Sequence, residues 1–156
     1  MIMTTIATLC YIIKDGKVLL IKKKKGLGKG VWNGPGGKVN TGEAVEDAAA
    51  REVMEEINVA PDNPKKAGEL EFYYDGESEV DWHVHVFVAE DYDGVEKETE
   101  EATPKWFPVK KIPYDEMWPD DRIWMPLVLE KKRFRGKFYF EKNTRNIVNH
   151  SIEVLQ

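Results

Sequence analysis

A glycine-rich loop that leads directly into a helix is the feature that most constrains the fold of this chain. Residues 34–37 read Gly-Pro-Gly-Gly, and the spacing that follows predicts a helix over residues 41–57. At about 100° per residue, Glu52, Glu55 and Glu56 share one face of this helix. Three neighbouring carboxylates repel one another, and a hard divalent cation such as Mg²⁺ would relieve that repulsion because it prefers oxygen ligands.

The other residues of this helix predict how it is capped and packed. Thr41 is a suitable N-cap, and Glu43 would lie in the first turn, where negative charge is favoured. Arg51 can pair with Glu55 or with Asp47, each four residues away. The face expected to meet the core carries Ala49, Ala50, Val53, Met54 and Ile57.

A glutamate-rich helix face by itself is typical of a solvated surface. The preceding loop changes this interpretation. Gly36 and Gly37 allow the backbone to approach a ligand closely, and the loop ends where helix amides open toward anions. Together, the loop and the helix indicate a site for a metal ion and a phosphate-bearing ligand.

The same segment resembles the signature of the Nudix hydrolases, G-x5-E-x7-R-E-U-x-E-E-x-G-U, where U is a bulky aliphatic residue. One position departs from it, because Asn58 stands where the family has glycine. Asn is the next-best residue for a left-handed helix C-cap, so we expect the geometry to survive. The resemblance implies the α+β Nudix fold, an α/β/α sandwich with a mixed β-sheet. The matching residues are Gly37, Glu43, Arg51, Glu52, Val53, Glu55, Glu56 and Val59.

Beyond the signature, nearly the whole chain resembles the MutT-homologue oxidised purine nucleoside triphosphatases. The most specific piece is Met-Trp-Pro-Asp-Asp at residues 117–121. The resemblance implies Mg²⁺-dependent hydrolysis of 8-oxo-dGTP and 2-oxo-dATP to the monophosphate and pyrophosphate. Such an enzyme cleans the nucleotide pool and prevents DNA damage. The other matching pieces are Lys23-Lys24, residues 30–34, residues 83–87, Trp106-Phe107, Trp124, Pro126, Leu127 and Lys131-Lys132.

The residues of this second element also suit recognition of a base. Trp118 can stack on a purine face. Burial of Asp120 beside Asp121 favours protonation of one carboxyl, so the pair can both donate and accept hydrogen bonds. Asn33 offers a donor and an acceptor. The alternative is an ordinary helix N-terminus with either aspartate as the N-cap.

The resemblance assigns roles residue by residue. Glu56 or Glu101 would be the general base, and the sequence leaves that choice open; Glu100, beside Glu101, leaves the loop position uncertain by one residue. Mn²⁺ is expected to substitute for Mg²⁺. The implied metal-binding residues are Gly36, Glu52, Glu55, Glu56 and Glu101, and Arg51 joins the four glutamates as catalytic. The implied substrate-binding residues are Thr8, Lys23, Asn33, Gly36, Gly37, Lys38, Trp118, Asp120 and Asp121.

Several alternatives remain open at this point. His83 and His85 alternate along a predicted strand and share a face; two such residues can bind a metal, but we favour packing and hydrogen bonding. Leu27 and Pro35 replace aromatic residues of the similar enzymes near the expected pocket. The substrate could therefore be an unmodified or methylated nucleotide or a capped RNA end. A non-catalytic nucleotide-binding module is less favoured, since such modules typically lose signature glutamates.

Composition and length agree with one globular enzyme domain over residues 1–156. The net charge of −5 argues against polymeric nucleic acid as a partner. Cys10 is the only cysteine, which excludes an internal disulfide and fits a reducing compartment. No apolar run approaches the roughly 20 residues of a membrane span, and the N-terminus lacks the pattern of a signal peptide. We therefore expect a cytoplasmic protein with no membrane partner, most simply a monomer.

The remaining pattern predicts strands before and after this helix. A turn is expected at 61–64, an acidic loop at 96–101 and a helical turn at 114–117. A helix is expected at 122–132, with Pro126 near its first turn or at a kink. The predicted strands are 4–13, 18–22 after the Asp15-Gly16 turn, 69–74 and 82–89 around Asp75-Gly76, 105–109, and a closing hairpin of 137–141 with 147–154.

Overall fold

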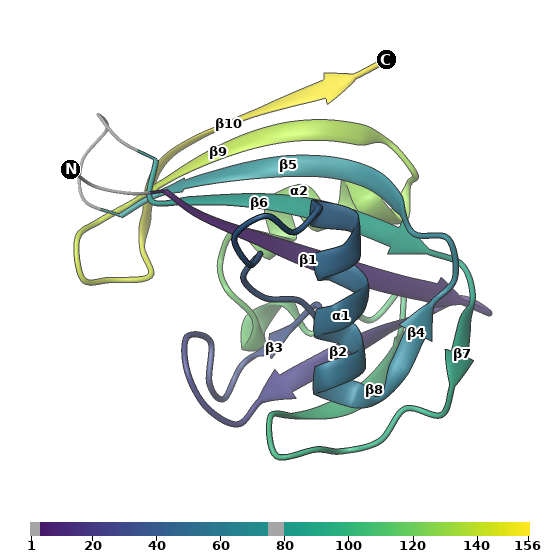
Figure 1. Cartoon of the computed structure of the whole chain (residues 1–156). Helices are drawn as coiled ribbons and strands as arrows, with labels where there is room; N and C mark the ends of the chain where they lie inside the picture. Colours follow the sequence, from purple (N-terminus) through teal and green to yellow (C-terminus); the bar gives the residue numbers. More distant parts are fainter. Residues whose placement is uncertain (1–3, 75–79) are drawn as a thin grey trace.

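The computed structural model describes residues 4–74 and 80–156 and consists of a curved mixed β-sheet with helices on both of its faces (Figure 1). In chain order the elements are β1 (Thr5–Lys14), β2 (Lys17–Lys23), β3 (Trp32–Asn33), α1 (Val45–Ile57), β4 (Val59–Pro61), β5 (Lys65–Tyr73), β6 (Trp82–Ala89), β7 (Tyr92–Gly94), β8 (Ala102–Pro108), the 3₁₀ turn η1 (Tyr114–Glu116), α2 (Asp121–Leu129), β9 (Arg133–Phe140) and β10 (Ile147–Leu155).

The main sheet has the strand order β10-β9-β5-β6-β1-β2-β3, and β8 pairs with β2 outside this path. The pairs β1–β6 and β5–β9 are parallel, whereas the neighbouring pairs are antiparallel. The short strands β4 and β7 form a separate antiparallel pair after α1. β1 therefore lies at the centre, with β6 on one side and the β2 hairpin partner on the other.

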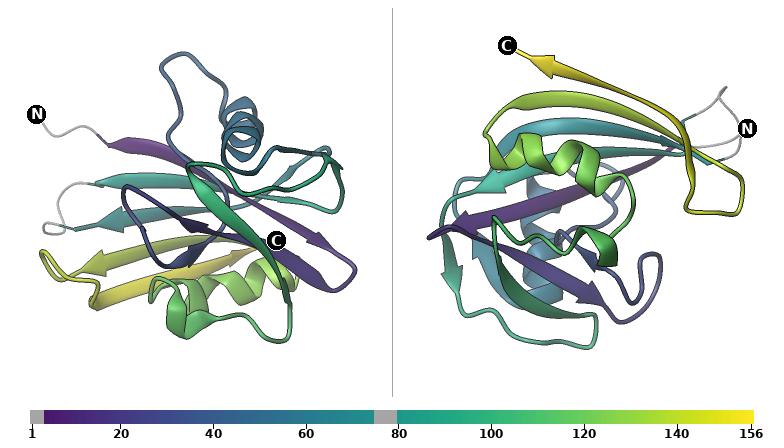
Figure 2. Two further views of the ribbon diagram at one scale, coloured as in Figure 1. Left: turned by 90° about the horizontal axis from the view of Figure 1, so that it is seen from below. Right: turned by 180° about the vertical axis from the view of Figure 1, so that it is seen from behind.

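Helices α1 and α2 cover opposite faces of this sheet, which gives the three layers seen in Figure 2. α1 contributes Ala49, Val53 and Ile57 to one hydrophobic core. α2 contributes Trp124 and Met125 to the other, larger core. The two cores exist because alternate residues of β1 point to opposite sheet faces. The predicted α/β/α sandwich with a mixed sheet is confirmed.

The predicted strands all occur, with shifts at their ends. Residues 82–89 match β6 directly, whereas β5 begins four residues before the predicted 69–74. The predicted turn at 61–64 is partly wrong, because residues 59–61 form β4. The three shortest strands, β3, β4 and β7, carry too few residues for a periodic pattern and were missed. Asp75-Gly76 lies outside the described residues.

The start of helix α1 differs from the prediction. The helix begins at Val45 with Ala44 as N-cap, and no side chain caps it. Thr41 is therefore not the N-cap, and Glu43 is outside the first turn. Glu43 instead accepts a 3.0 Å hydrogen bond from the Asn40 N–H and pairs with Arg51, so it orders the loop that enters the helix.

The C-terminus of α1 follows the prediction. Asn58 adopts a left-handed conformation, with φ 65° and ψ 30°, and its N–H donates to the Met54 carbonyl at 3.0 Å. Ala49, Val53 and Ile57 face the core as expected. Ala50 is only partly buried and Met54 is 44% exposed, because both lie at the margin of the packed face.

Among the described residues, no helix has the length and apolar character required to span a membrane.

Candidate active site

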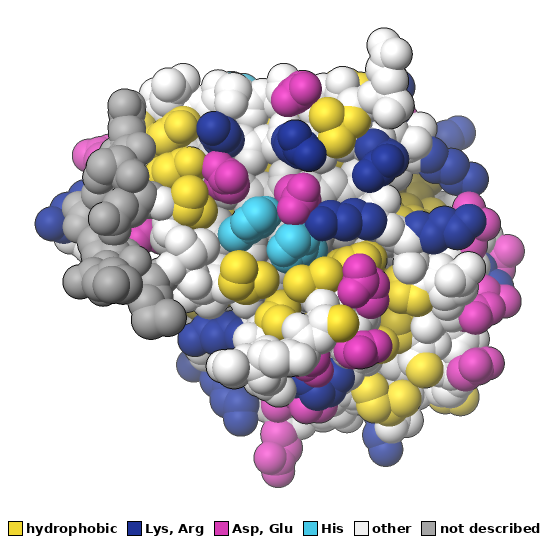
Figure 3. All heavy atoms as spheres, turned by 45° about the horizontal axis from the view of Figure 1, so that its top comes forward, with side chains coloured by type: hydrophobic (Ala, Val, Ile, Leu, Met, Phe, Trp, Pro, Cys, Tyr) yellow, Lys and Arg dark blue, Asp and Glu magenta, His cyan; other side chains and the backbone are white. Residues whose placement is uncertain are grey.

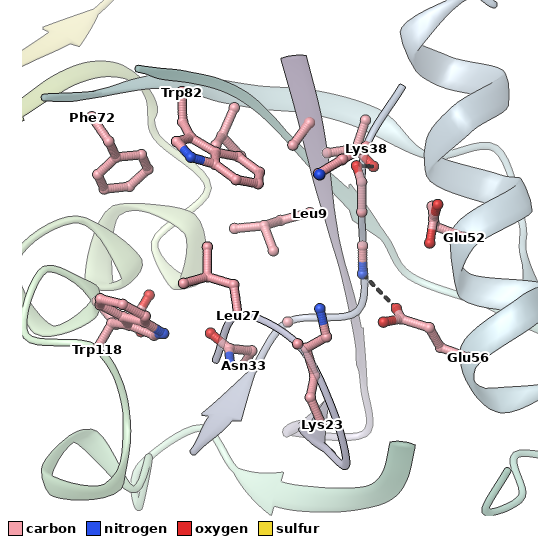
Figure 4. Close-up of a pocket in the computed structure, with 18 of the residues that line it drawn as sticks. Leu9, Lys23, Leu27, Asn33, Lys38, Glu52, Glu56, Phe72, Trp82 and Trp118 are labelled. Carbon is pink, nitrogen blue, oxygen red and sulfur yellow. Dashed lines mark hydrogen bonds between the residues drawn. The ribbon is translucent and has the colours of Figure 1, made fainter. Parts of the chain in front are cut away.

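A cavity of about 520 Å³ lies where β1, the glycine loop, α1 and the start of α2 meet (Figure 4). Glu52 and Glu56 line its α1 end, and Trp118 and Phe72 line the opposite end. The fold thereby joins the two sequence elements that resemble a known enzyme family. The predicted site residues that line it are Thr8, Lys23, Asn33, Gly36, Gly37, Lys38, Glu52, Glu56, Glu101, Trp118, Asp120 and Asp121.

The glycine loop is held along β1 by backbone hydrogen bonds. The Thr8 N–H donates to the Gly37 carbonyl and the Cys10 N–H donates to the Pro35 carbonyl, each at 2.8 Å. A Cβ atom at Gly36 would lie only 1.9 Å from the Thr8 carbonyl oxygen, and one at Gly37 would lie 2.4 Å from the Glu52 carboxyl carbon. Gly36 therefore requires glycine because it passes against the β1 backbone, whereas a side chain at Gly37 would displace the Glu52 carboxyl group.

Glu56 is the most deeply buried glutamate of the site, at 2% exposed. Its Oε1 accepts a 2.7 Å hydrogen bond from the Gly36 N–H. Burial raises the pKa of Glu56 to about 8, although the Gly36 N–H and Lys23 lower it in part. The carboxyl thus holds a proton that an incoming cation would displace.

Arg51 organises the more exposed glutamates of α1. Its guanidinium donates to Glu43 at 2.8 Å, to Glu52 at 2.9 Å and to Glu55 at 3.2 Å. It also donates to the Lys38 carbonyl at 3.0 Å. The predicted pairing with Glu55 is confirmed, whereas among the described residues Arg51 pairs with Glu43 and Glu52 rather than with Asp47. Arg51 therefore connects the loop to the helix face.

Glu52 and Glu55 differ in their surroundings. Glu52 lines the cavity, and burial raises its pKa while Arg51 opposes that shift. The Glu55 side chain is 47% exposed, and neither Glu55 nor Arg51 is among the described residues that line the cavity. A role for Glu55 as a metal ligand thus stays a prediction.

The acidic loop brings Glu101 to the same cavity, whereas Glu100 does not line it. Thr99 attaches this loop to α1: its hydroxyl donates to the Glu56 carbonyl at 2.6 Å and accepts from the Glu101 N–H at 3.1 Å. Of the two adjacent glutamates, Glu101 is therefore the one placed to act with Glu52 and Glu56.

At the other end of the cavity, Asp120 and Asp121 are 4% and 5% exposed. The Trp124 indole N–H donates to Asp120 Oδ2 at 2.7 Å, which identifies Asp120 as an acceptor. Burial raises the pKa of Asp120 to about 6. Burial and the neighbouring charge of Asp120 raise the pKa of Asp121 well above its ordinary range. Of the two carboxyls, Asp121 therefore holds its proton more strongly.

These aspartates do not serve as helix caps. Asp120 occupies the N-cap position of α2, but its side chain makes no capping hydrogen bond. The Asp121 Oδ2 atom is buried without a hydrogen-bond partner. Because an unpaired buried oxygen is unfavourable, this geometry suits a ligand that completes its hydrogen bonding.

Trp118 and Asn33 form the wall beside the two aspartates. A Cβ on Gly28 would lie 3.0 Å from Asn33 Nδ2 and 3.4 Å from Trp118 Nε1, so the 24–31 loop packs closely behind both. The Arg145 guanidinium lies 4.4 Å from the Trp118 ring centre in a cation–π contact. The indole ring is thus held in place from the β9–β10 connection.

The cavity wall also contains residues that the sequence did not single out. Trp82 and Val84 of β6 line it, as do Leu9 and Tyr74. The Lys38 ammonium lies 5.8 Å from the Trp82 ring centre. The alternation of side chains along β6 could have predicted these two wall residues, because it places Trp82 and Val84 on the face opposite His83 and His85.

The donor set fits a hard divalent cation. Glu52, Glu56 and Glu101 supply carboxylate oxygens, the ligand type that hard divalent cations accept. The raised pKa of Glu56 reflects a buried carboxyl without a full counter-charge. Lys23 and Lys38 add positive charge on the cavity wall, as an anionic ligand requires.

The chain matches known proteins over most of its length. Residues 3–128 match the NUDIX domain family. The chain is 44% identical over 156 residues to an oxidized purine nucleoside triphosphate hydrolase of Danio rerio, covering 100% of this chain and 99% of that protein. It is also 44% identical over 134 residues to the Mus musculus protein of the same name, covering 86% and 85% of the two chains.

A solved structure matches the fold over nearly the full length. The mutator MutT protein from Bacillus halodurans superposes with a TM-score of 0.85 at 23% identity and covers 96% of this chain and 97% of its own. At this identity the likeness concerns the fold.

Proposed function

This chain belongs to the NUDIX domain family, and on that basis we propose that it hydrolyses oxidised purine nucleoside triphosphates, such as 8-oxo-dGTP and 2-oxo-dATP, to the monophosphate and pyrophosphate. The observation that carries the proposal is the single cavity bounded by carboxylates at one end and by Trp118, Asp120 and Asp121 at the other. The relatives that are 44% identical bear the name oxidized purine nucleoside triphosphate hydrolase.

The phosphate end carries the proposed chemistry. Mg²⁺, with Mn²⁺ as a substitute, would be held by Glu52, Glu56 and Glu101 with the Gly36 carbonyl and Glu55, and would neutralise phosphate charge and acidify bound water. Glu56 or Glu101 would accept the proton of the water that attacks a bridging phosphorus. Lys23 and Lys38 would bind the phosphate oxygens as cations.

The base end carries the proposed selectivity. Trp118 would stack on the purine face. The protonated Asp121 would donate a hydrogen bond and Asp120 would accept one, since their pKa values differ. The Asn33 amide can either donate or accept a hydrogen bond. Thr8 and the backbone of residues 36–37 would border the sugar and phosphates. A purine whose edge presents both a donor and an acceptor would satisfy this arrangement.

We further propose that residues 1–156 act as one domain, as a monomer in the cytoplasm, on free nucleotides rather than on nucleic acid polymers. The cavity volume of about 520 Å³ and the net charge of −5 support a small substrate. Nucleotide-pool sanitation, and with it the prevention of DNA damage, would be the biological role.

The proposal is tested by pyrophosphate release from a nucleotide panel with Mg²⁺. We expect kcat/KM for 8-oxo-dGTP or 2-oxo-dATP to exceed that for dGTP and dATP by at least tenfold. Higher activity on methylated or unmodified triphosphates would replace the substrate assignment. These nucleotides belong in the panel because Leu27, which replaces an aromatic residue of the similar enzymes, lines the cavity. Nucleotide binding without pyrophosphate release would instead identify a non-catalytic module.

A further inference from the structure

Three nitrogen atoms converge on one carboxylate oxygen on the sheet face opposite the cavity. Glu69 Oε1 lies 3.1 Å from His83 Nε2, 3.4 Å from His85 Nδ1 and 3.2 Å from Lys66 Nζ. Glu69 and His85 are directly paired across β5 and β6, and His83 lies two residues earlier on the same face. The cluster is separate from the nucleotide cavity, because Trp82 and Val84 point to that cavity from the other face of β6.

The cluster is open to solvent on one side. The side chains of Glu69, His83 and His85 are 27%, 30% and 13% exposed. Figure 3 shows two histidines side by side at the surface, with acidic and basic side chains around them. The imidazole rings are stacked, with centres 4.6 Å apart and planes 18° from parallel. This arrangement leaves room for water beside the convergent donors.

The distances suit a tetrahedral transition-metal ion. Metal bonds of about 2.1 Å in a tetrahedron separate the ligand atoms by about 3.4 Å. The two Glu69–histidine distances are close to this value, and the three ligand atoms all lie within 4.8 Å of one another. Two imidazoles and a carboxylate favour Zn²⁺ or its neighbours over Mg²⁺, which prefers oxygen ligands.

A cation already balances this cluster in the described structure. The Lys66 ammonium lies 2.6 Å from His85 Nδ1 as well as near Glu69, and the Arg135 guanidinium lies 3.8 Å from the other Glu69 oxygen. Because an ammonium group only donates hydrogen bonds, His85 Nδ1 accepts this one through the lone pair that a metal ion would use. A divalent ion would compete with the flexible Lys66 side chain for the same position.

We propose that Glu69, His83 and His85 form a surface binding site for Zn²⁺ or a similar transition-metal ion, with water as the fourth ligand. The site would clip β5 to β6 and is independent of the proposed hydrolase activity. Binding of Zn²⁺ in excess Mg²⁺ would distinguish this surface site from the cavity, whose carboxylates suit Mg²⁺.

The test is a Zn²⁺ titration of the full chain in excess Mg²⁺, followed by calorimetry and by NMR of ¹⁵N-labelled histidine side chains. The wild type should shift the ring nitrogens of His83 and His85. Glu69→Gln and His83→Gln should each weaken this binding at least tenfold. His150→Gln is the matched control, because His150 lies on β10, stacked on Phe138, and should leave Zn²⁺ affinity unchanged.

Lys66→Met provides a second variant that does not remove a ligand. Loss of the competing ammonium should tighten Zn²⁺ binding several-fold. The proposal is overturned if the wild type shows no histidine shifts, if Glu69→Gln binds like the wild type, or if Lys66→Met leaves the affinity unchanged. Circular dichroism of each metal-free variant would establish that it is folded.

Discussion

The Gly36 backbone N–H donates a 2.7 Å hydrogen bond to the buried Glu56 carboxyl group. This bond connects the glycine loop to α1 across 20 residues of sequence. It also places the site's most buried carboxyl where the loop passes β1. Glu56 is therefore the position where we test a substitution that removes the negative charge and keeps the side-chain volume.

Glu56→Gln should lower turnover by about 10²–10⁴-fold while the protein stays folded, because the amide keeps the volume but cannot act as a base or an anionic ligand. Steady-state pyrophosphate release with Mg²⁺ measures this. Glu46→Gln is the control, since Glu46 is an exposed residue of the same helix. Turnover above about a tenth of the wild type would remove Glu56 from the proposed metal site.

Asp120→Asn and Asp121→Asn should each reduce kcat/KM for oxidised purine triphosphates far more than they weaken Mg²⁺ binding. Each amide fixes a donor–acceptor pattern that the carboxyl pair can adjust by moving a proton. An unpaired buried polar group costs about 1–3 kcal/mol, or roughly 5- to 150-fold. Kinetics on 8-oxo-dGTP, 2-oxo-dATP and dGTP would measure the change, which should differ between the two oxidised bases. Wild-type selectivity in both variants would contradict base recognition by these residues.

Asp121→Asn should also make the ligand-free protein more stable than the wild type as the pH rises from 4 to 7. The folded pKa of Asp121 is raised, mainly by burial, above its ordinary value of 3.8. Above pH 3.8 the unfolded chain therefore releases a proton that the folded chain retains, and the free energy of unfolding falls by up to about 1.4 kcal/mol per pH unit. Asparagine has no such proton, so the contribution of Asp121 to the slope should disappear and the variant's slope should be shallower than that of the wild type.

Urea unfolding at pH 4.5, 5.5 and 7 would measure this difference between the two proteins. Asp62→Asn, at an exposed position outside the cavity, is the control and should follow the wild-type slope. A constant difference at all three pH values would show that Asp121 titrates normally in the folded state.

Asn58→Gly should be tolerated, with turnover close to the wild type and a change in stability within about 1 kcal/mol. The backbone at Asn58 is left-handed, and glycine adopts that conformation at no steric cost. Thermal denaturation and pyrophosphate release would test both expectations. A large loss of activity would assign a role to the Asn58 side chain beyond the cap.

Local patterns accounted for much of what the sequence revealed. The spacing of Glu52 and Glu56, the left-handed cap at Asn58 and the alternation along β6 depend on residues only a few positions apart. The match to a family signature has the same origin, because the loop-and-helix unit is contiguous. For these features the backbone geometry follows from the order of the residues themselves.

Contacts between segments that are distant in sequence determine the start of α1 and the three shortest strands. α1 begins at Val45 rather than near Thr41 because Arg51, the Asn40 N–H and β1 hold Glu43 and its loop outside the helix. Strands β3, β4 and β7 exist through pairing with partners elsewhere in the chain, which outweighs the weak preference of two or three residues.

Tertiary packing also determines which of the predicted site residues come together in the cavity. Helix periodicity points Glu55 and Glu56 about 100° apart, and packing against the loop buries Glu56 and leaves Glu55 with Arg51 at the surface. Likewise, the folded sheet brings Asp120 and Asp121 to the same cavity that Glu52 lines from α1. Burial in that cavity raises the pKa of both aspartates, and that of Asp121 more than that of Asp120. Sequence periodicity sets which side chains share a face, whereas burial and charge depend on what packs against that face.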